Sequence, residues 1–335
     1  MGIGNTRWKR SPWPPRDEQT ILVRSWTLLA RSAGAPLLLR WRLSLGVVIV
    51  SALAALVWLD FGAPTPGAYL LPLALVVATL AAGEIHRLVC VRDIQPAAWA
   101  VYGGTLAVVA ASGIPYLRPG ESGPVGPLGW TLIALMLFVA AALLIEIVHF
   151  EQADLAALRA GLCVFAVAYA GGLLGFLIHL RFVIDRSWGA FALVSLLVIV
   201  KIGDIGAYTV GRLVGRHKLA PKLSPGKTIE GFLGGLVLSA LSALVLMELV
   251  APRMVHSYSG GTAWWRTVAF GLILGAAGVV GDLAESMLKR AAGVKDSSRW
   301  MPGFGGVLDL VDSLLLAAPV AYVLWMAGLV GPGMP

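Results

Sequence analysis

The sequence predicts an all-α, polytopic integral membrane protein with about nine transmembrane helices. Of its 335 residues, 58% are hydrophobic and only 13% are charged, and the mean hydropathy is +0.82. A soluble domain carries about a quarter charged residues. Several apolar runs also approach the ~20 residues that a helix needs to cross the hydrocarbon core of a bilayer. Composition and hydropathy therefore predict the same class.

Nine apolar spans follow one another along the chain. The third is marginal in length, and the sixth and eighth carry charges at one end. The predicted spans are residues 43–60, 68–84, 97–113, 128–148, 160–179, 188–209, 231–250, 267–285 and 307–330.

Three regions follow from this pattern. Residues 1–42 form a basic Trp/Arg-rich cytoplasmic tail, in which the amphipathic spacing of 18–32 favours an interfacial helix, with a partly disordered tail as the alternative. Residues 43–185 hold the N-terminal transmembrane helices. Residues 186–335 form a C-terminal transmembrane region in which the candidate catalytic residues gather.

The distribution of basic residues predicts the orientation in the membrane. Most of the 26 Lys and Arg residues fall on the side of the N-terminal tail, as expected for cytoplasmic segments. The opposite side holds Arg118, Arg181, Arg186, Arg253 and Arg266. We therefore expect a multi-pass protein of the cell inner (cytoplasmic) membrane, with the N-terminus cytoplasmic and the C-terminus on the opposite side. Topology accounts for the formal charge of +8 without nucleic acid as a partner.

The first polar cluster covers residues 201–235. Lys201 and Asp204 lie three residues apart near the end of a predicted span, where an internal ion pair is the plain alternative to a functional role. A basic loop follows, and within it Ser224 and Pro225 are typical of a helix start, with Ser224 as the N-cap. A helix N-terminus surrounded by lysines suits a phosphate. The stretch PKLSPGKT is no P-loop, because Pro221 replaces its first glycine.

The second polar cluster covers residues 281–313. Asp282 and Glu285 share one face of a predicted span, and Asp309 and Asp312 share one face of the next. Intramembrane acids usually mark a functional site. Hard carboxylate oxygens beside a lysine-rich loop suit Mg²⁺ carrying a polyphosphate rather than zinc. In the N-terminal half, solvation at a cytoplasmic span end explains Glu84 and Glu146, and a functional role for them is the less favoured alternative.

These two clusters resemble the signatures of the phosphatidate cytidylyltransferase (CDP-diacylglycerol synthase) family. The C-terminal family signature, S-x-x-K-R-x4-K-D and then P-G-H-G-G-x-x-D-R-x-D, is matched from Ser286 to Asp312. The upstream pattern, K-x-x-D-T-G-A-Y-x-x-G-R and then S-P-K-K-T-x-E-G, is matched from Lys201 to Gly231. The resemblance is strong over about residues 195–325.

The resemblance implies an enzyme that converts CTP and phosphatidic acid into CDP-diacylglycerol and diphosphate. It implies Mg²⁺ as cofactor, with a second, monovalent cation as a further option, and it suggests a homodimer among membrane lipids. It makes Asp282, Asp309 and Asp312 metal ligands and, together with Lys289, the catalytic set. The substrate-binding positions that it implies are Lys201, Asp204, Lys222, Ser224, Lys227, Glu230, Arg290 and Lys295.

Four departures from the family pattern stand out. Phe304 replaces the signature histidine, Leu310 the arginine between the acids, Gly226 a lysine and Ile205 a small polar residue. All the signature acids survive, and buried acids without a partner are costly, so we expect an active variant. The alternatives are a nucleotidyltransferase for another lipid phosphate, or a transporter of anionic solutes, whose usual internal repeats are not seen.

Overall fold

The computed structural model describes residues 35–90, 94–117, 125–150, 153–258, 260, 262–298, 301 and 305–331. The chain divides into two compact units, residues 1–52 and residues 53–335. The described part of the first unit is the beginning of helix α2 (Ala35–Gly62), which continues into the second unit. The second unit contains all the other helices and strands.

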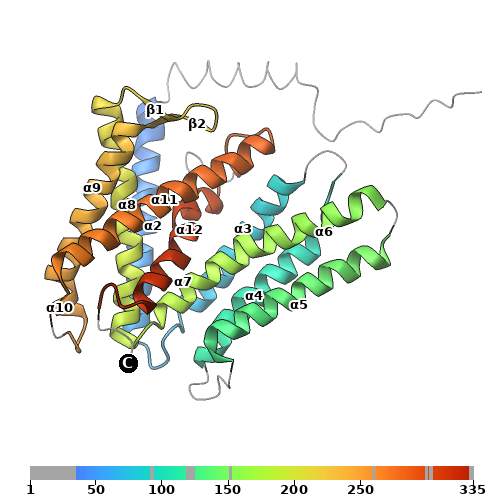
Figure 1. The fold of residues 1–335 in the computed structure, drawn as a ribbon, viewed down its shortest axis with the longest axis horizontal. Coiled ribbons are helices and arrows are strands. Elements are labelled where there is room, and N and C mark those ends of the chain that lie inside the picture. Colours follow the sequence, from blue (N-terminus) through green and yellow to red (C-terminus); the bar gives the residue numbers. More distant parts are fainter. Residues whose placement is uncertain are drawn as a thin grey trace, which may run out of the picture. The chain divides into compact units, whose positions relative to one another are not determined.

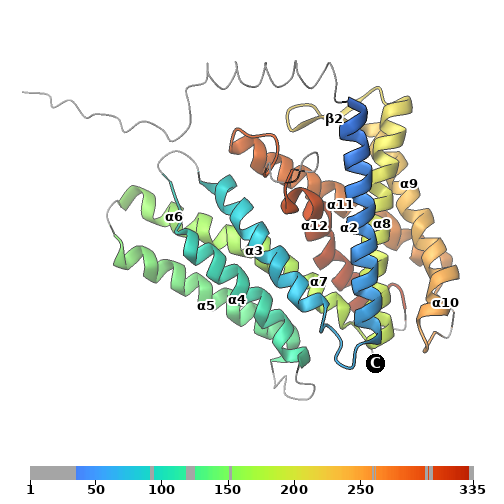
Figure 2. The ribbon, with the colours of Figure 1, turned by 180° about the vertical axis from the view of Figure 1, so that it is seen from behind.

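The second unit is built almost entirely of helices (Figures 1 and 2). Its elements after α2 are α3 (Leu70–Val89), α4 (Ala98–Leu117), α5 (Gly126–Val148), α6 (Ala153–Val167), the π-helical segment η1 (Ala168–Gly172), α7 (Leu173–Arg181), α8 (Arg186–Val214), β1 (Lys218–Ala220), β2 (Ser224–Thr228), α9 (Ile229–Val245), the π-helical η2 (Leu246–Val250), α10 (Ala251–Met254), α11 (Trp264–Ala291) and α12 (Val307–Met326).

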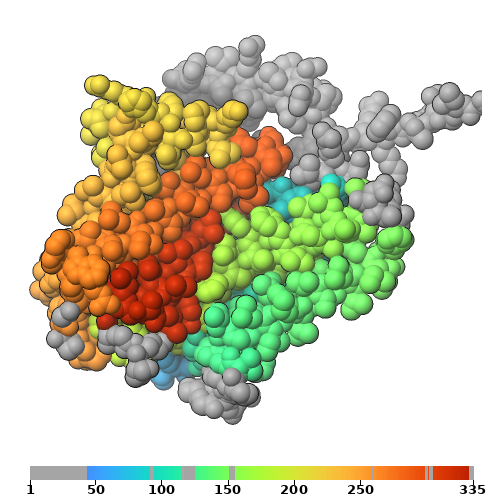
Figure 3. Space-filling view, viewed as in Figure 1, coloured from blue at the N-terminus to red at the C-terminus, as the bar shows by residue number. Residues whose placement is uncertain are grey.

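The helices of this unit form two groups that meet at α12 and α7. Helices α3, α4, α5 and α6 pack together on one side, and α8, α9 and α11 pack together on the other. Helix α12 contacts α11, α8, α7 and α3, so it lies between the groups. Figure 3 shows α11 (orange) and α12 (red) side by side on one face. The polar residues of α12 therefore have neighbours from both halves of the sequence.

The predicted membrane architecture is confirmed. Within the described residues, eight helices are long and apolar enough to cross a bilayer, and a ninth apolar helix, Ala98–Ile114, is shorter. That ninth helix is the span that the sequence marked as marginal. The fifth predicted span is continuous from Leu155 to Arg181 and contains the π-helical segment η1. The protein is a polytopic, helical membrane protein.

The predicted helix start at Ser224 is wrong. Residues Ser224–Thr228 form strand β2, which pairs antiparallel with β1, and helix α9 begins at Ile229. Its N-cap is Thr228, whose Oγ1 accepts a hydrogen bond from the Gly231 N–H at 3.1 Å. Pro225 fits this hairpin because a two-stranded sheet consists of edge strands, where a missing N–H costs little. Among the described residues, this hairpin is the one two-stranded sheet, and the other named elements are helices.

A buried ion pair ties together the end of α2 and the end of α7. The Arg181 Nε donates to Asp60 Oδ2 at 2.8 Å, and the side chains are 3% and 0% exposed. Asp60 also accepts from the backbone N–H groups of Gly67 and Tyr69 at 3.1 and 3.2 Å. Arg181, which the charge distribution placed outside the membrane, is therefore a buried structural residue.

Candidate active site

Helices α8, α11 and α12 bring the predicted acids and lysines of the two sequence clusters together. Lys201 and Asp204 come from α8, Asp282 and Lys289 from α11, and Asp309 and Asp312 from α12. Helices α11 and α12 approach each other closely at Gly281. Any larger residue there would clash, because a Cβ at this position would lie 2.5 Å from the backbone oxygen of Asp312. Asp282 therefore follows a point of direct backbone contact between the two helices.

Lys201 and Asp204 form the α8 side of the site. The Lys201 Nζ lies 3.2 Å from Asp204 Oδ2 and donates to Ser313 Oγ at 2.8 Å. Ser313 in turn donates to Asp204 Oδ2 at 3.1 Å. The internal ion pair expected as the plain alternative is present, and it also links α8 to α12 through Ser313.

Lys289 is the central cation between α11 and α12. Its Nζ contacts Glu285 Oε2 and lies 2.6 Å from Asp309 Oδ1. Glu285 is fully buried, and among the described residues its Oε1 has no hydrogen-bond partner. Asp309 Oδ2 accepts from the N–H groups of Ser297 and Gly306 at 3.0 and 2.8 Å, and from the Ser297 hydroxyl. Lys289 is therefore a largely covered cation shared by two acids.

The hairpin β1–β2 lies against α11 and contributes a further cation, Lys227, to the site. The Lys227 Nζ lies 2.6 Å from Asp282 Oδ2, and the Arg290 Nε donates to the backbone oxygen of Leu223 at 3.3 Å. Both contacts join the hairpin to α11. Lys227 thus lies beside one of the acids, although it belongs to a hairpin rather than to a helix N-terminus, whereas Arg290 contacts backbone oxygens and its phosphate-binding role stays a prediction.

Four predicted residues occupy other positions. The Glu230 carboxylate accepts from the backbone N–H groups of Arg216 and His217 and contacts His217 Nδ1 at 2.6 Å. It thereby links the first turn of α9 to the segment that precedes β1. Ser224 faces Ala220 in the strand pair. Lys222 and Lys295 are exposed in the hairpin turn and in the loop after α11. Their substrate-binding roles stay predictions. Phe304 lies outside the described residues, and Leu310 is half-buried.

The sequence did not identify Glu84 as part of this region. We expected a solvated residue at the end of a span, but Glu84 is 1% exposed and its carboxylate contacts the start of α12. That expectation is wrong, because a residue 224 positions away covers the carboxylate. Ser297 and Ser313 were also missed. Glu285 was singled out with Asp282 from their spacing but was given no role, and its contact with Lys289 four residues further along the same helix face supplies one.

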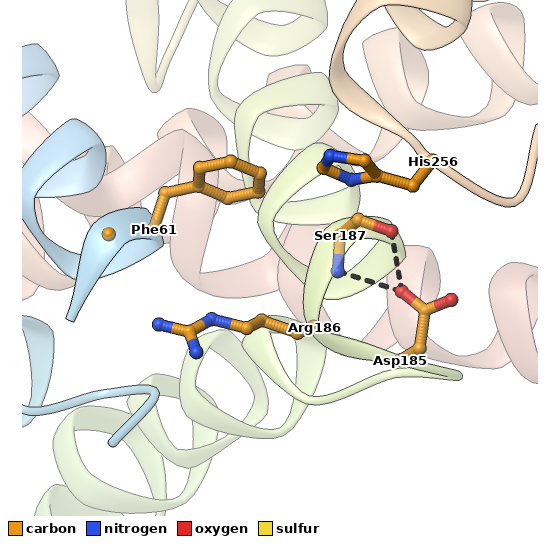
Figure 4. A pocket seen from close by; sticks show the side chains of 6 residues that line it. Phe61, Asp185, Arg186, Ser187 and His256 are labelled. Carbon is orange, nitrogen blue, oxygen red and sulfur yellow. Dashed lines mark hydrogen bonds between the residues drawn. The ribbon is translucent and has the colours of Figure 1, made fainter. Parts of the chain in front are cut away.

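A separate hollow lies at the other end of α8 (Figure 4). It measures about 360 Å³ and is lined by Phe61, Gly62, Asp185, Arg186, Ser187 and His256. From Arg186 to Lys201, α8 rises about 22 Å, so this hollow is not part of the acidic site.

Asp185, which lines this hollow, is the N-cap of α8. Burial alone raises the pKa of Asp185, but hydrogen bonds from the Trp188 and Ser187 N–H groups and from the Ser187 and Ser257 hydroxyls outweigh burial and lower the pKa. The carboxylate acts as a helix cap, which is a structural role.

Comparison with known proteins identifies the family. The model of the cytidylyltransferase family matches residues 40–327. The chain belongs to the cytidylyltransferase family.

Curated relatives are named phosphatidate cytidylyltransferase. Those of Staphylococcus saprophyticus and Staphylococcus haemolyticus are both 40% identical over 165 residues, which is 49% of this chain and 58% of the relative. That of Staphylococcus aureus strain COL is 38% identical over 194 residues, 58% of this chain and 68% of the relative. The chain thus spans little more than half the length of the first two relatives.

The resemblance to this family implies a bound metal ion, and the side chains of the site can be compared with the ligands that such an ion requires. Asp282, Asp309 and Asp312 offer hard oxygen ligands, and the orphaned Oε1 of Glu285 is a buried acceptor that suits a cation. In the part of the chain that the structure describes, no three His, Cys, Asp or Glu residues group around one metal position. Lys227 and Lys289 instead neutralise Asp282 and Asp309. The donors suit Mg²⁺ in kind, and their grouping stays a prediction.

Proposed function

We propose that the protein is a phosphatidate cytidylyltransferase, which converts CTP and phosphatidic acid into CDP-diacylglycerol and diphosphate. The observation that carries the proposal is the cluster of lysine-neutralised carboxylates where α8, α11 and α12 meet beside the basic hairpin. Membership of the cytidylyltransferase family and the names of the relatives support the same reaction. A phosphate oxygen of the lipid attacks the α-phosphorus of CTP, and the bond to the leaving diphosphate breaks.

In this proposal the cations of the site hold the phosphates of CTP. Lys227 retains 23% exposure of its side chain and is paired with a single carboxylate, so an incoming phosphate can replace Asp282 as its partner. Arg290, at the C-terminal end of α11, is the second phosphate-binding cation. Lys289 is 12% exposed and lies between the charges of Glu285 and Asp309. These residues supply positioning and charge stabilisation, which phosphoryl-type transfer chiefly requires.

Mg²⁺ belongs to the proposal as the cofactor, with Asp282, Asp309 and Asp312 as its ligands. When bound, it supplies neutralisation of the developing phosphate charge. We also propose the inner membrane as the location, with the N-terminus cytoplasmic and the C-terminus on the opposite side. The basic hairpin and the acids then lie on the cytoplasmic side, where CTP is available.

The proposal is tested with purified protein in detergent, labelled CTP, phosphatidic acid and Mg²⁺. Wild type should form CDP-diacylglycerol, Asp309→Asn should lose at least about 100-fold in rate, and the exposed control Glu248→Gln should match wild type. If wild type forms no more product than Asp309→Asn, the synthase proposal fails. Omitting Mg²⁺ tests the cofactor, and parallel reactions with other lipid phosphates and with dCTP test the alternative acceptors and nucleotide.

A further inference from the structure

Glu84 is a buried carboxylate that the proposed chemistry does not use directly. It lies near the end of α3, in the N-terminal half of the chain, and is 1% exposed. Its Oε1 accepts from the Val307 N–H at 3.1 Å, and its Oε2 accepts from the Leu308 N–H at 2.7 Å and from the Ser297 hydroxyl at 3.0 Å. A buried carboxylate is costly unless such donors compensate it, so these contacts explain how the charge is accommodated.

The two backbone donors belong to the first turn of α12. N–H groups at a helix start have no partner within the helix, and the helix dipole favours a negative charge there. Glu84 takes the N–H groups of Val307 and Leu308, while Asp309 takes that of Gly306. Three successive amides are thus bound by carboxylates. The protein's own acids therefore accept the hydrogen bonds of the backbone N–H groups at the start of α12.

Ser297 connects Glu84 to Asp309. Its hydroxyl lies within hydrogen-bond distance of Glu84 Oε2 and of Asp309 Oδ2 and donates to one of them at a time, while its N–H donates to Asp309. Gly306 makes room for the arrangement, because a Cβ there would lie 2.3 Å from both Glu84 carboxylate oxygens and from Ser297 Oγ. The Asp309 carboxylate is therefore positioned from two sides: Lys289 contacts it on one side, and Ser297, which also hydrogen-bonds Glu84, contacts it on the other.

We propose that Glu84 is a positioning residue for the reaction of this site: it fixes the first turn of α12 and, through Ser297, the carboxylate of Asp309. The inference rests on the proposed function, which it deepens. Glu84 acts through Asp309 and does not itself contact substrate. A residue of the N-terminal half thereby takes part in a site whose other residues all come from positions 201–313.

Kinetics of Glu84→Gln test the positioning role. Glutamine has the same size, but its amide nitrogen would face a backbone N–H or the Ser297 hydroxyl and cannot accept from it. We expect kcat to fall about 10- to 100-fold, as for other groups that orient a functional ligand, with KM for CTP and phosphatidic acid changed by less than about twofold. Glu84→Asp should recover part of the rate. A Glu84→Gln variant with wild-type kcat would overturn the proposal and leave only a packing role.

Glu146 provides the matched control. It also lies near the end of a helix of the N-terminal half, and it pairs with Arg159 at 2.9 Å on the next helix. Glu146→Gln should keep the kcat of wild type. An equal loss in both variants would indicate a general effect of removing a glutamate from this half of the protein, which contradicts a specific link from Glu84 to Asp309.

Hydrogen exchange gives a readout that does not depend on activity. In Glu84→Gln, the amides of Val307 and Leu308 should exchange faster, while peptides of α9 keep their protection. Unchanged exchange at these two amides would refute the contact, and faster exchange with unchanged kcat would refute its role in positioning. If wild type lacks cytidylyltransferase activity, the proposed function fails, whereas exchange still decides whether Glu84 holds α12. If Glu84→Gln does not fold, Ser297→Ala cuts the same link and should lower kcat similarly.

Discussion

Replacing Asp60 with asparagine should destabilise the protein without impairing its chemistry. The substitution removes the counter-charge of Arg181, whose side chain is only 3% exposed. An asparagine side chain also cannot accept at both of its polar atoms, while Asp60 accepts from Gly67 and Tyr69 as well as from Arg181. Removing one partner of a buried ion pair typically costs about 3–5 kcal/mol, because the other charge stays buried and uncompensated. We expect a loss of that size in the free energy of unfolding.

The measurement is unfolding in detergent micelles, followed by circular dichroism, for wild type, Asp60→Asn and a double variant that combines Asp60→Asn with Arg181→Met. The double variant removes both charges and should recover much of the loss. Glu146→Gln is a useful comparison, because its pair with Arg159 is more exposed, at 14% and 17%, and should cost less. Turnover per folded molecule should be unchanged in Asp60→Asn.

Three results would refute this reasoning. A loss below about 1 kcal/mol in Asp60→Asn would mean that water or relaxation solvates Arg181 and that the pair is not buried in effect. A double variant as unstable as Asp60→Asn would mean that the uncompensated charge is not the cause. A fall in turnover per folded molecule would show that the Asp60–Arg181 pair affects the chemistry of the acidic site as well as stability.

Two further predictions concern the acidic site. Lys227→Met should raise KM for CTP about tenfold, since a charged hydrogen bond to phosphate contributes about 1.5–3 kcal/mol. Lys218→Met, at an exposed position of the partner strand β1, should leave KM unchanged, and equal increases in both variants would indicate only a general charge effect. Gly281→Ala should cost about 1–3 kcal/mol in unfolding free energy and lower kcat, because its Cβ would meet the Asp312 backbone at 2.5 Å. Gly278→Ala, whose Cβ meets a Val200 methyl at 2.9 Å, should be milder, and equal effects would contradict the importance of the α11–α12 approach.

Local patterns in the sequence determined much of this protein. Apolar runs of sufficient length predicted the helices to within a few residues at most ends, because a span must satisfy its own backbone hydrogen bonds in lipid. The spacing of Asp282 and Glu285, and that of Asp309 and Asp312, predicted a polar site on two helices, since residues three apart share a helix face. The motifs from Lys201 to Asp312 predicted the family, which comparison with known proteins confirmed.

Tertiary structure decided what depends on contacts between distant segments. Ser224 and Pro225 are typical of a helix start, yet pairing with β1 places them in a strand and moves the cap to Thr228. Glu84 looked like a solvated span end because its donors lie more than 200 residues further along the chain. Arg181 is buried for the same reason, since its partner Asp60 is 121 positions away. Periodicity reports which face a side chain occupies, whereas burial and partners depend on which other helix covers that face.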